Sequence, residues 1–84
     1  MKFRANINIM PRPELLDPQG KATTQGLQNL GFDNVQDLRI GKRIQLDLEA
    51  ADRSVAEEKV DEACKKLLAN LIMESYEFEL EELN

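Results

Sequence analysis

The stretch FRANINIM at residues 3–10 decides the fold class. Apolar side chains occupy every second position from Phe3 to Ile9, and the side chains between them are polar. A period of two with one polar face is typical of a half-buried β-strand. Pro11 and Pro13 follow, and proline removes a donor from the hydrogen-bond ladder. We therefore predict a strand over residues 3–10.

A helix is predicted next, over residues 18–30. Asp17 is a good cap for the free amides of a first turn, and Pro18 suits the first helical position. Gly31 is the expected stop. A glycine inside a helix, here Gly26, costs about 1 kcal/mol relative to alanine, so we expect close approach of the sheet or of another chain there. The residues predicted to face inward are Ala22, Gly26, Leu27 and Leu30.

Two short runs with apolar residues, at residues 35–40 and 44–48, flank Gly41 and Lys42, and the second alternates. They are predicted to form a β-hairpin with the glycine at its tip. Ser54 and Glu57 have the spacing of a capping box, which predicts the start of a second helix. Its inward stripe is predicted to be Val60, Ala63, Cys64, Leu67 and Leu68, and a last strand with an acidic outer face is predicted over residues 74–80.

The element order β-α-β-β-α-β predicts an α+β fold of ferredoxin-like type for residues 1–84 as a single domain. In this fold a four-stranded antiparallel sheet has both helices on one face and leaves the other open. The open face is predicted to carry Arg4, Asn6, Asn8, Gln45, Asp47, Glu49, Glu77 and Glu79. RNA-binding domains of this topology stack bases on aromatic side chains of the first and third strands. The absence of rings there argues against nucleic acid.

Composition narrows the function further. The 84 residues include one cysteine, no histidine and no tryptophan, and the net charge is −5. Residues 1–43 are net basic by three charges and residues 44–84 net acidic by eight. An acidic chain is a poor partner for nucleic acid or an anionic membrane, and neither an apolar span nor a signal segment is recognisable. We expect a cytoplasmic protein whose small core makes self-association favourable.

Chemistry by this chain alone is not expected. Cys64 falls on the apolar stripe of the second helix, where a buried core cysteine is expected, and no histidine is available to activate it. A metal chaperone of this fold would carry Cys-x-x-Cys in the loop that here holds Pro11 and Pro13. The glycines do not form a phosphate-binding loop, and Gly41-Lys42 is interpreted as a solvated turn. No catalytic, cofactor-binding or metal-binding residue is predicted.

Three segments together resemble one known family, the PurS subunit of phosphoribosylformylglycinamidine synthase, also called formylglycinamide ribonucleotide amidotransferase. They are LDPQGKA at residues 16–22, LGF at 30–32 followed by LRIGK at 38–42, and CKKLLAN at 64–70 followed by ESY at 74–76. The chain departs from the family pattern at Leu71, where proline is common, and in the loop with Pro11 and Pro13. These departures lie outside the matching segments.

The resemblance implies a non-catalytic subunit of a glutamine-dependent, ATP-consuming ligase of purine biosynthesis. Its implied partners are a synthetase subunit, PurL, and a glutaminase subunit, PurQ, which use the ATP and the glutamine. The small subunit is expected to assemble them, to help pass ammonia between them and to form a homodimer or higher homo-oligomer. The candidate partner contacts are Asp17, Gln19, Gly20, Lys21, Arg39, Gly41 and Lys42.

Two other functions stay open at this point. An ACT-type domain shares the predicted topology and binds small molecules such as amino acids, but it would carry a glycine-bearing loop after the first strand. Calorimetric titration with amino acids distinguishes such a sensor from an assembly subunit. An independent small enzyme would show turnover by the chain alone.

Overall fold

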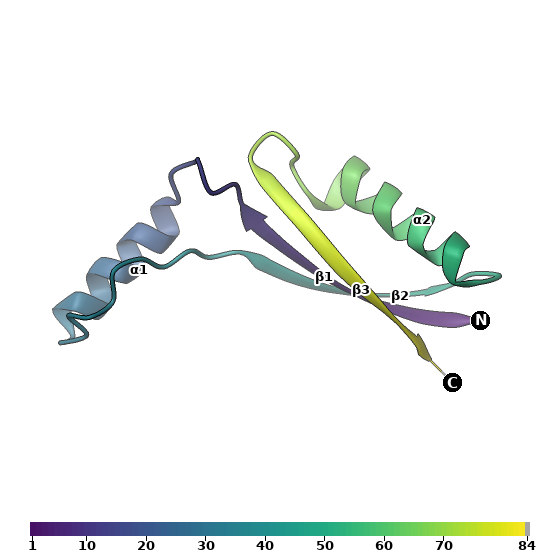
Figure 1. Cartoon of the computed structure of the whole chain (residues 1–84), viewed down its shortest axis with the longest axis horizontal. Helices are drawn as coiled ribbons and strands as arrows, with labels where there is room; N and C mark the ends of the chain where they lie inside the picture. Colours follow the sequence, from purple (N-terminus) through teal and green to yellow (C-terminus); the bar gives the residue numbers. More distant parts are fainter. Residues whose placement is uncertain (84) are drawn as a thin grey trace.

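A sheet of three antiparallel strands, in the order β2-β1-β3, is the centre of the fold (Figure 1). The computed structural model describes residues 1–83. The strands are β1 (Lys2–Pro11), β2 (Lys42–Glu49) and β3 (Glu74–Leu83); the helices are α1 (Pro18–Asn29) and α2 (Arg53–Ala63), and α2 continues into the π-helical turn η1 (Cys64–Leu68). Neither helix in this described part of the chain combines the length and the apolar character that a membrane span requires. The fold is α+β.

β1 lies between the other two strands over most of its length. Lys2 is opposite Glu49 of β2 and Leu83 of β3, and the pairing continues without a bulge to Ile9 on one side and Pro11 on the other. Every second side chain of β1 from Phe3 to Ile9 is fully buried. The alternation predicted for this strand and for the last strand is confirmed.

α2 packs on the apolar face of the sheet. Val60 and Cys64 join Ala5, Ile7 and Ile9 in one buried cluster. The helix begins one residue before Ser54, because the Asp52 side chain accepts a 2.9 Å hydrogen bond from the Val55 amide. The predicted Ser54 and Glu57 capping box is therefore wrong, since an aspartate two residues upstream already supplies the cap.

The π-helical turn changes which leucine faces the sheet. The Ala69 amide donates to the Cys64 carbonyl at 2.9 Å, a bond that spans one residue more than in an α-helix. The extra residue rotates the end of the apolar stripe. Leu68 packs against the core, whereas Leu67, which was predicted to face inward, is 83% exposed.

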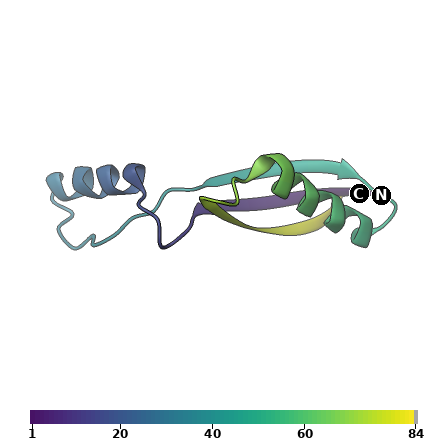
Figure 2. The same ribbon diagram turned by 90° about the horizontal axis from the view of Figure 1, so that it is seen from above.

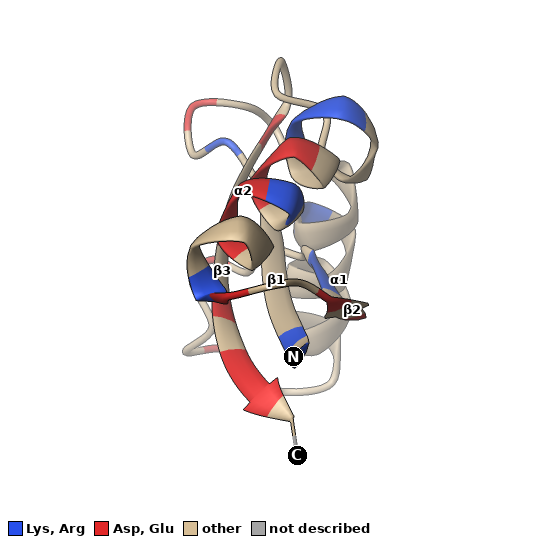
Figure 3. Ribbon diagram, turned by 90° about the vertical axis from the view of Figure 1, so that its right-hand side faces the viewer, with Lys and Arg blue, Asp and Glu red and all other residues tan. Residues whose placement is uncertain are grey.

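The opposite face of the sheet is open and polar, as predicted. Arg4 on β1 donates two hydrogen bonds to the Asp47 carboxylate on β2, at 2.8 and 3.1 Å, and Gln45 donates to Asn6 at 3.3 Å. Acidic side chains are numerous on β3, seen from the end of the sheet in Figure 3. The exposed glutamates that β3 contributes to this face are Glu77, Glu79 and Glu81.

The predicted fourth strand, residues 35–40, is not a strand in the described part of the chain. The polar groups of this segment bond to the neighbourhood of α1 instead of to a ladder. Val35 accepts from the Gln28 side chain at 3.0 Å, and the Ile40 amide donates to Asp17 at 2.8 Å. The chain then runs from this segment into β2, so the predicted hairpin around Gly41 and Lys42 is also wrong.

α1 does not cover the sheet, although both helices were predicted on one face. It extends beyond one end of the sheet as an arm (Figures 1 and 2). The radius of gyration is 16.5 Å, whereas a compact domain of this length has roughly 12 Å. The predicted stop is confirmed by Gly31, whose φ of 98° suits glycine. Of the side chains predicted to face inward, only Leu27 is half-buried, and Ala22, Gly26 and Leu30 are exposed.

Candidate functional site

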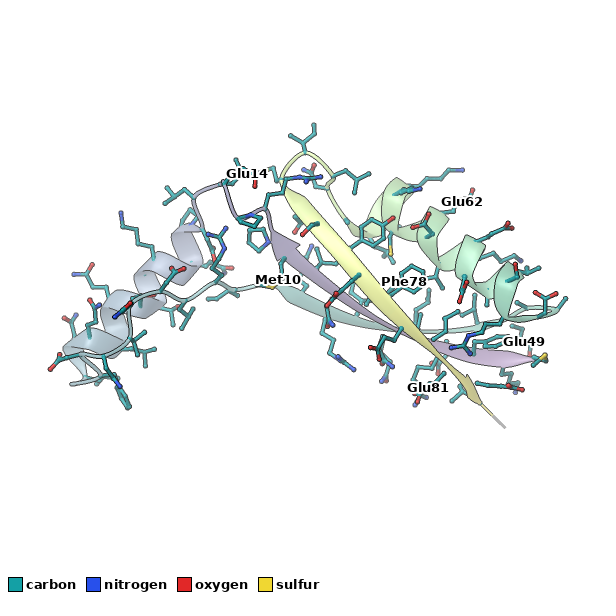
Figure 4. The ribbon with its side chains drawn as sticks, in the orientation of Figure 1. Met10, Glu14, Glu49, Glu62, Phe78 and Glu81 are labelled. Atoms are coloured by element: carbon teal, nitrogen blue, oxygen red, sulfur yellow. The ribbon has the colours of Figure 1, made fainter. Side chains whose placement is uncertain are left out.

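The candidate residues gather where the sheet passes into the arm. We call residues 12–17 and 38–41, the two segments that connect the sheet to α1 and the end of the arm, the neck. In Figure 4, Met10 marks the sheet side of the neck and Glu14 lies in its first segment. Asp17, Arg39 and Gly41 belong to the neck, Gln19, Gly20 and Lys21 to the first turn of α1, and Lys42 is the first residue of β2.

Asp17 connects the two segments of the neck. It is the N-cap residue of α1, and its backbone carbonyl accepts from the Lys21 amide at 2.9 Å. Its side chain, however, accepts from the Ile40 amide at 2.8 Å and makes no capping hydrogen bond to the helix. The Ile40 amide and, to a smaller extent, the Gly20 amide lower the pKa of the Asp17 carboxyl. The carboxylate is thus stabilised in its charged form at neutral pH.

Two of the candidate glycines are required by close packing. A Cβ atom on Gly20 would overlap the Leu38 carbonyl oxygen, and one on Gly41 would overlap the carbonyl oxygen of Ile9. Gly20 is the one buried residue of α1. Both glycines therefore serve contacts within this chain.

Arg39 uses its guanidinium group inside the chain as well. Its Nη2 donates to the carbonyl oxygens of Arg12 and Leu15, at 2.9 Å each. Its Nε is buried and has no hydrogen-bond partner among the described residues. The guanidinium therefore faces the backbone of the first neck segment, which distinguishes it from an exposed basic side chain.

The other three candidates point to solvent. Gln19 and Lys21 are exposed on the first turn of α1. Lys42 forms an ion pair with Glu74 at 3.5 Å, and its side chain remains 57% exposed. Exposed ion pairs of this kind contribute little free energy, so Lys42 is available to a partner.

Arg12 is the neck residue that sequence reasoning missed. Its Nε and Nη2 both donate to the Leu71 carbonyl, at 3.0 and 2.6 Å, and its amide donates to the Met73 carbonyl at 2.9 Å. It thereby fastens the neck to the turn before β3. The available signal was its position between Pro11 and Pro13. The two prolines restrict the backbone of the loop, so the basic side chain between them is held near a fixed contact.

The chemical groups of the described residues fit binding rather than catalysis. An open groove of about 430 Å³ lies between α1 and residues 36–39, and polar side chains line most of it. No group of three metal-ligating side chains is assembled within residues 1–83. Cys64 is fully buried, and burial, followed by the nearby Asp61 charge, raises the pKa of its thiol. The interpretation of Cys64 as a core residue is confirmed.

Comparison with known proteins gives one consistent result. The family model "PurS: Phosphoribosylformylglycinamidine (FGAM) synthase" matches residues 4–82. The PurS subunit of this synthase from Synechocystis is 46% identical over 78 residues, which cover 93% of this chain and 78% of the relative. The subunit from Bacillus subtilis is 38% identical over 81 residues, covering 96% of this chain and 95% of the relative.

Solved structures agree with the sequence relatives. The structure of Bacillus subtilis PurS has a TM-score of 0.87 at 39% identity and covers 95% of this chain and 99% of its own. A chain in the structure of PurLQS from Thermotoga maritima has a TM-score of 0.88 at 34% identity and covers 95% of this chain and 98% of its own. The chain therefore belongs to the PurS family of phosphoribosylformylglycinamidine synthase subunits.

Proposed function

We propose that this chain is the small assembly subunit of phosphoribosylformylglycinamidine synthase in purine biosynthesis. The observation that carries the proposal is the match of nearly the whole chain to a chain of the Thermotoga maritima PurLQS structure. In this role it brings together a synthetase subunit of PurL type and a glutaminase subunit of PurQ type and helps ammonia pass between them. Its own residues agree with the role, because the one thiol is buried and held in its neutral form.

The test is reconstitution with and without this chain. The two larger subunits are mixed, and synthesis is measured once with glutamine and once with ammonium chloride as the nitrogen source. We expect omission of this chain to abolish glutamine-dependent synthesis and to leave ammonia-dependent synthesis intact. Glutamine-dependent synthesis at full rate in its absence would contradict the assembly role. Loss of both activities would contradict the role in ammonia transfer.

We infer that Gln19, Lys21 and Lys42 supply the partner contacts, while the candidates with contacts inside the chain support the fold of the neck. Gln19, Lys21 and Lys42 present their polar groups to solvent. We expect the double variant Lys21→Ala, Lys42→Ala to weaken co-elution with the larger subunits, with an unchanged circular dichroism spectrum. The matched control is Lys59→Ala, an exposed lysine on α2 remote from the neck. Equal co-elution of the double variant and the control would refute the contacts.

We further propose that a second copy of the chain completes the ferredoxin-like arrangement. The neck and the arm expose large apolar side chains, with Leu16 at 73%, Leu30 at 76% and Phe32 at 52%. On the sheet, Ile44, Leu46 and Leu48 of β2 are half-buried. Apolar area that is exposed on the arm and on the sheet favours a homodimer in which each arm lies on the sheet of the other copy. The free buried thiol and the biosynthetic role support a cytoplasmic location for this assembly.

A further inference from the structure

The arm depends on the neck for its orientation. Within residues 1–83, the two neck segments are the chain that joins α1 to the sheet, since the helix extends beyond the sheet's end (Figure 2). Two irregular segments that join a helix to a sheet would ordinarily allow the helix to change its orientation, because irregular backbone has many allowed conformations. A fixed arm therefore requires side-chain contacts across the two neck segments.

The neck has contacts at three places, of which the first two join its own segments and the third joins it to β1 and the turn before β3. Nearest the arm, Asp17 accepts from the Ile40 amide at 2.8 Å, and the Leu38 carbonyl packs on Gly20. In the middle, Arg39 Nη2 donates to the Arg12 and Leu15 carbonyls at 2.9 Å each.

Nearest the sheet, the Arg12 guanidinium donates to the Leu71 carbonyl, and Gly41 packs on the Ile9 backbone. Together the three places connect α1, the neck, β1 and the turn before β3. All three join segments that are distant in the sequence.

Arg39 occupies the middle point, where one group binds two carbonyls of the opposite segment. Hydrogen bonds from a charged donor are stronger than neutral ones, and the planar guanidinium fixes the angle between its acceptors. A lysine keeps the charge but lacks this geometry. The distinction between Arg and Lys therefore separates a geometric role from a role in attracting an acidic partner.

We propose that Arg39, together with Asp17 and Arg12, is a positioning residue that locks α1 at a fixed angle to the sheet before any partner binds. The larger subunits, or a second copy, then meet an arm that is already oriented. The lock goes beyond the assembly function proposed above, and it is measured on this chain alone. Its failure would leave the reconstitution result unaffected.

Amide hydrogen exchange tests the lock in the full-length chain at one protein concentration. The variants are Arg39→Ala and Arg39→Lys, and the matched controls are Arg43→Ala and Arg43→Lys. Arg43 lies four residues away on β2 and makes only a 3.4 Å contact with the Asn8 side chain. We expect exchange at the Ile40 amide and in α1 to become about tenfold faster in both Arg39 variants, as the loss of one or two net hydrogen bonds predicts.

The β1 amides report separately on the fold of the sheet. Unchanged protection there, together with faster exchange in the arm, supports the lock. Wild-type exchange at Ile40 and α1 in Arg39→Ala, or in Arg39→Lys, overturns it. Should the alanine variant lose β1 protection as well, Arg39→Lys decides alone, because it keeps the charge and most of the side-chain volume.

A distance measurement gives an independent readout. Spin labels at Asn29→Cys on the arm and Glu79→Cys on the open face, in a Cys64→Ala background, report the spread of arm orientations. We expect one narrow distance distribution with native Arg39 and a broad one with Arg39→Lys. Equally broad distributions in both would show that the arm is never locked.

Discussion

At the scale of single residues, the contact between Tyr76 and Asp61 is the clearest electrostatic feature. The Tyr76 hydroxyl on β3 donates to the Asp61 carboxylate on α2. This hydrogen bond, with burial and then the Asp61 charge, raises the pKa of Tyr76 to about 12. The pair thus links the helix to the edge of the sheet.

Tyr76 is the one tyrosine of the chain, so its titration can be followed by ultraviolet absorbance. We expect a midpoint near 12 in the native protein. Asp61→Asn removes the charge and should move the midpoint down toward the ordinary value of 10.0. Asp47→Asn, whose carboxylate pairs with Arg4 on the open face, is the control and should leave the midpoint in place. A native midpoint near the ordinary value would contradict the contact.

The sign of the linkage follows from the raised pKa. The folded state holds the phenol proton more tightly than the unfolded state, so the stabilisation is fully present below pH 10. It is lost as the pH rises from there through about 12. The wild-type protein should therefore lose more stability than Asp61→Asn over this range in urea titrations.

Substitution of alanine is expected to change the stability in opposite directions at two glycines. At Gly41 a Cβ would overlap the Ile9 carbonyl, whereas at Gly26 nothing within 4 Å opposes it. We expect Gly41→Ala to destabilise the fold by about 1–3 kcal/mol through overpacking. Gly26→Ala should stabilise it by about 1 kcal/mol through helix propensity. Urea unfolding measures both, and a stabilised Gly41→Ala variant would refute the close approach.

At the scale of elements, the π-helical turn decides which of two neighbouring leucines is structural. Leu68 packs against the core, whereas Leu67 is 83% exposed. We expect Leu68→Ala to cost about 2 kcal/mol, near the lower end for a core leucine because its burial is partial. Leu67→Ala should change stability by less than about 0.5 kcal/mol. Equal losses in urea unfolding would mean that the helix continues as an α-helix in solution.

The elements differ in how far the sequence predicts them. β1 and β3 follow from alternation, because both lie beside other strands and bury one face, which is the situation that a period of two reports. Residues 35–40 carry apolar side chains at positions 35, 38 and 40 and were predicted to be a strand, but their polar groups bond to α1 and the neck. A local pattern identifies an extended segment without identifying its partner. The N-cap at Asp52 and the π-helical turn were missed for a related reason. A different capping residue and one extra residue in the last turn leave the spacing of the apolar residues in the sequence almost unchanged.

The sequence motifs identify residues that lie near one another but do not identify what each side chain contacts. The motif residues do lie together in space, around the neck. Asp17, Gly20, Arg39 and Gly41, however, make contacts within their own chain. Whether a polar side chain faces outward or toward a backbone carbonyl depends on the path of the neck, which no local pattern encodes. Arg12 was missed for the same reason.

At the scale of the whole molecule, exposed apolar residues link folding to association. Leu16 in the neck and Leu30 on the arm are 73% and 76% exposed, and Ile72 in the turn before β3 is 85% exposed. If a second copy covers the arm, mass action stabilises the folded dimer as concentration rises. We expect the Tm to rise by several degrees over a hundredfold range of protein concentration. A Tm independent of concentration over that range would contradict the proposed dimer.

The elongated shape has a consequence for the surface area. The chain exposes 6162 Å², whereas a compact protein of its mass exposes roughly 5,100 Å². The surplus of roughly 1,000 Å² is comparable to the area of about 800 Å² that each partner contributes to a standard interface. Because α1 extends beyond the sheet, the unassembled chain exposes about as much extra surface as one interface covers. Assembly can therefore reduce its exposed area to that of an ordinary compact domain.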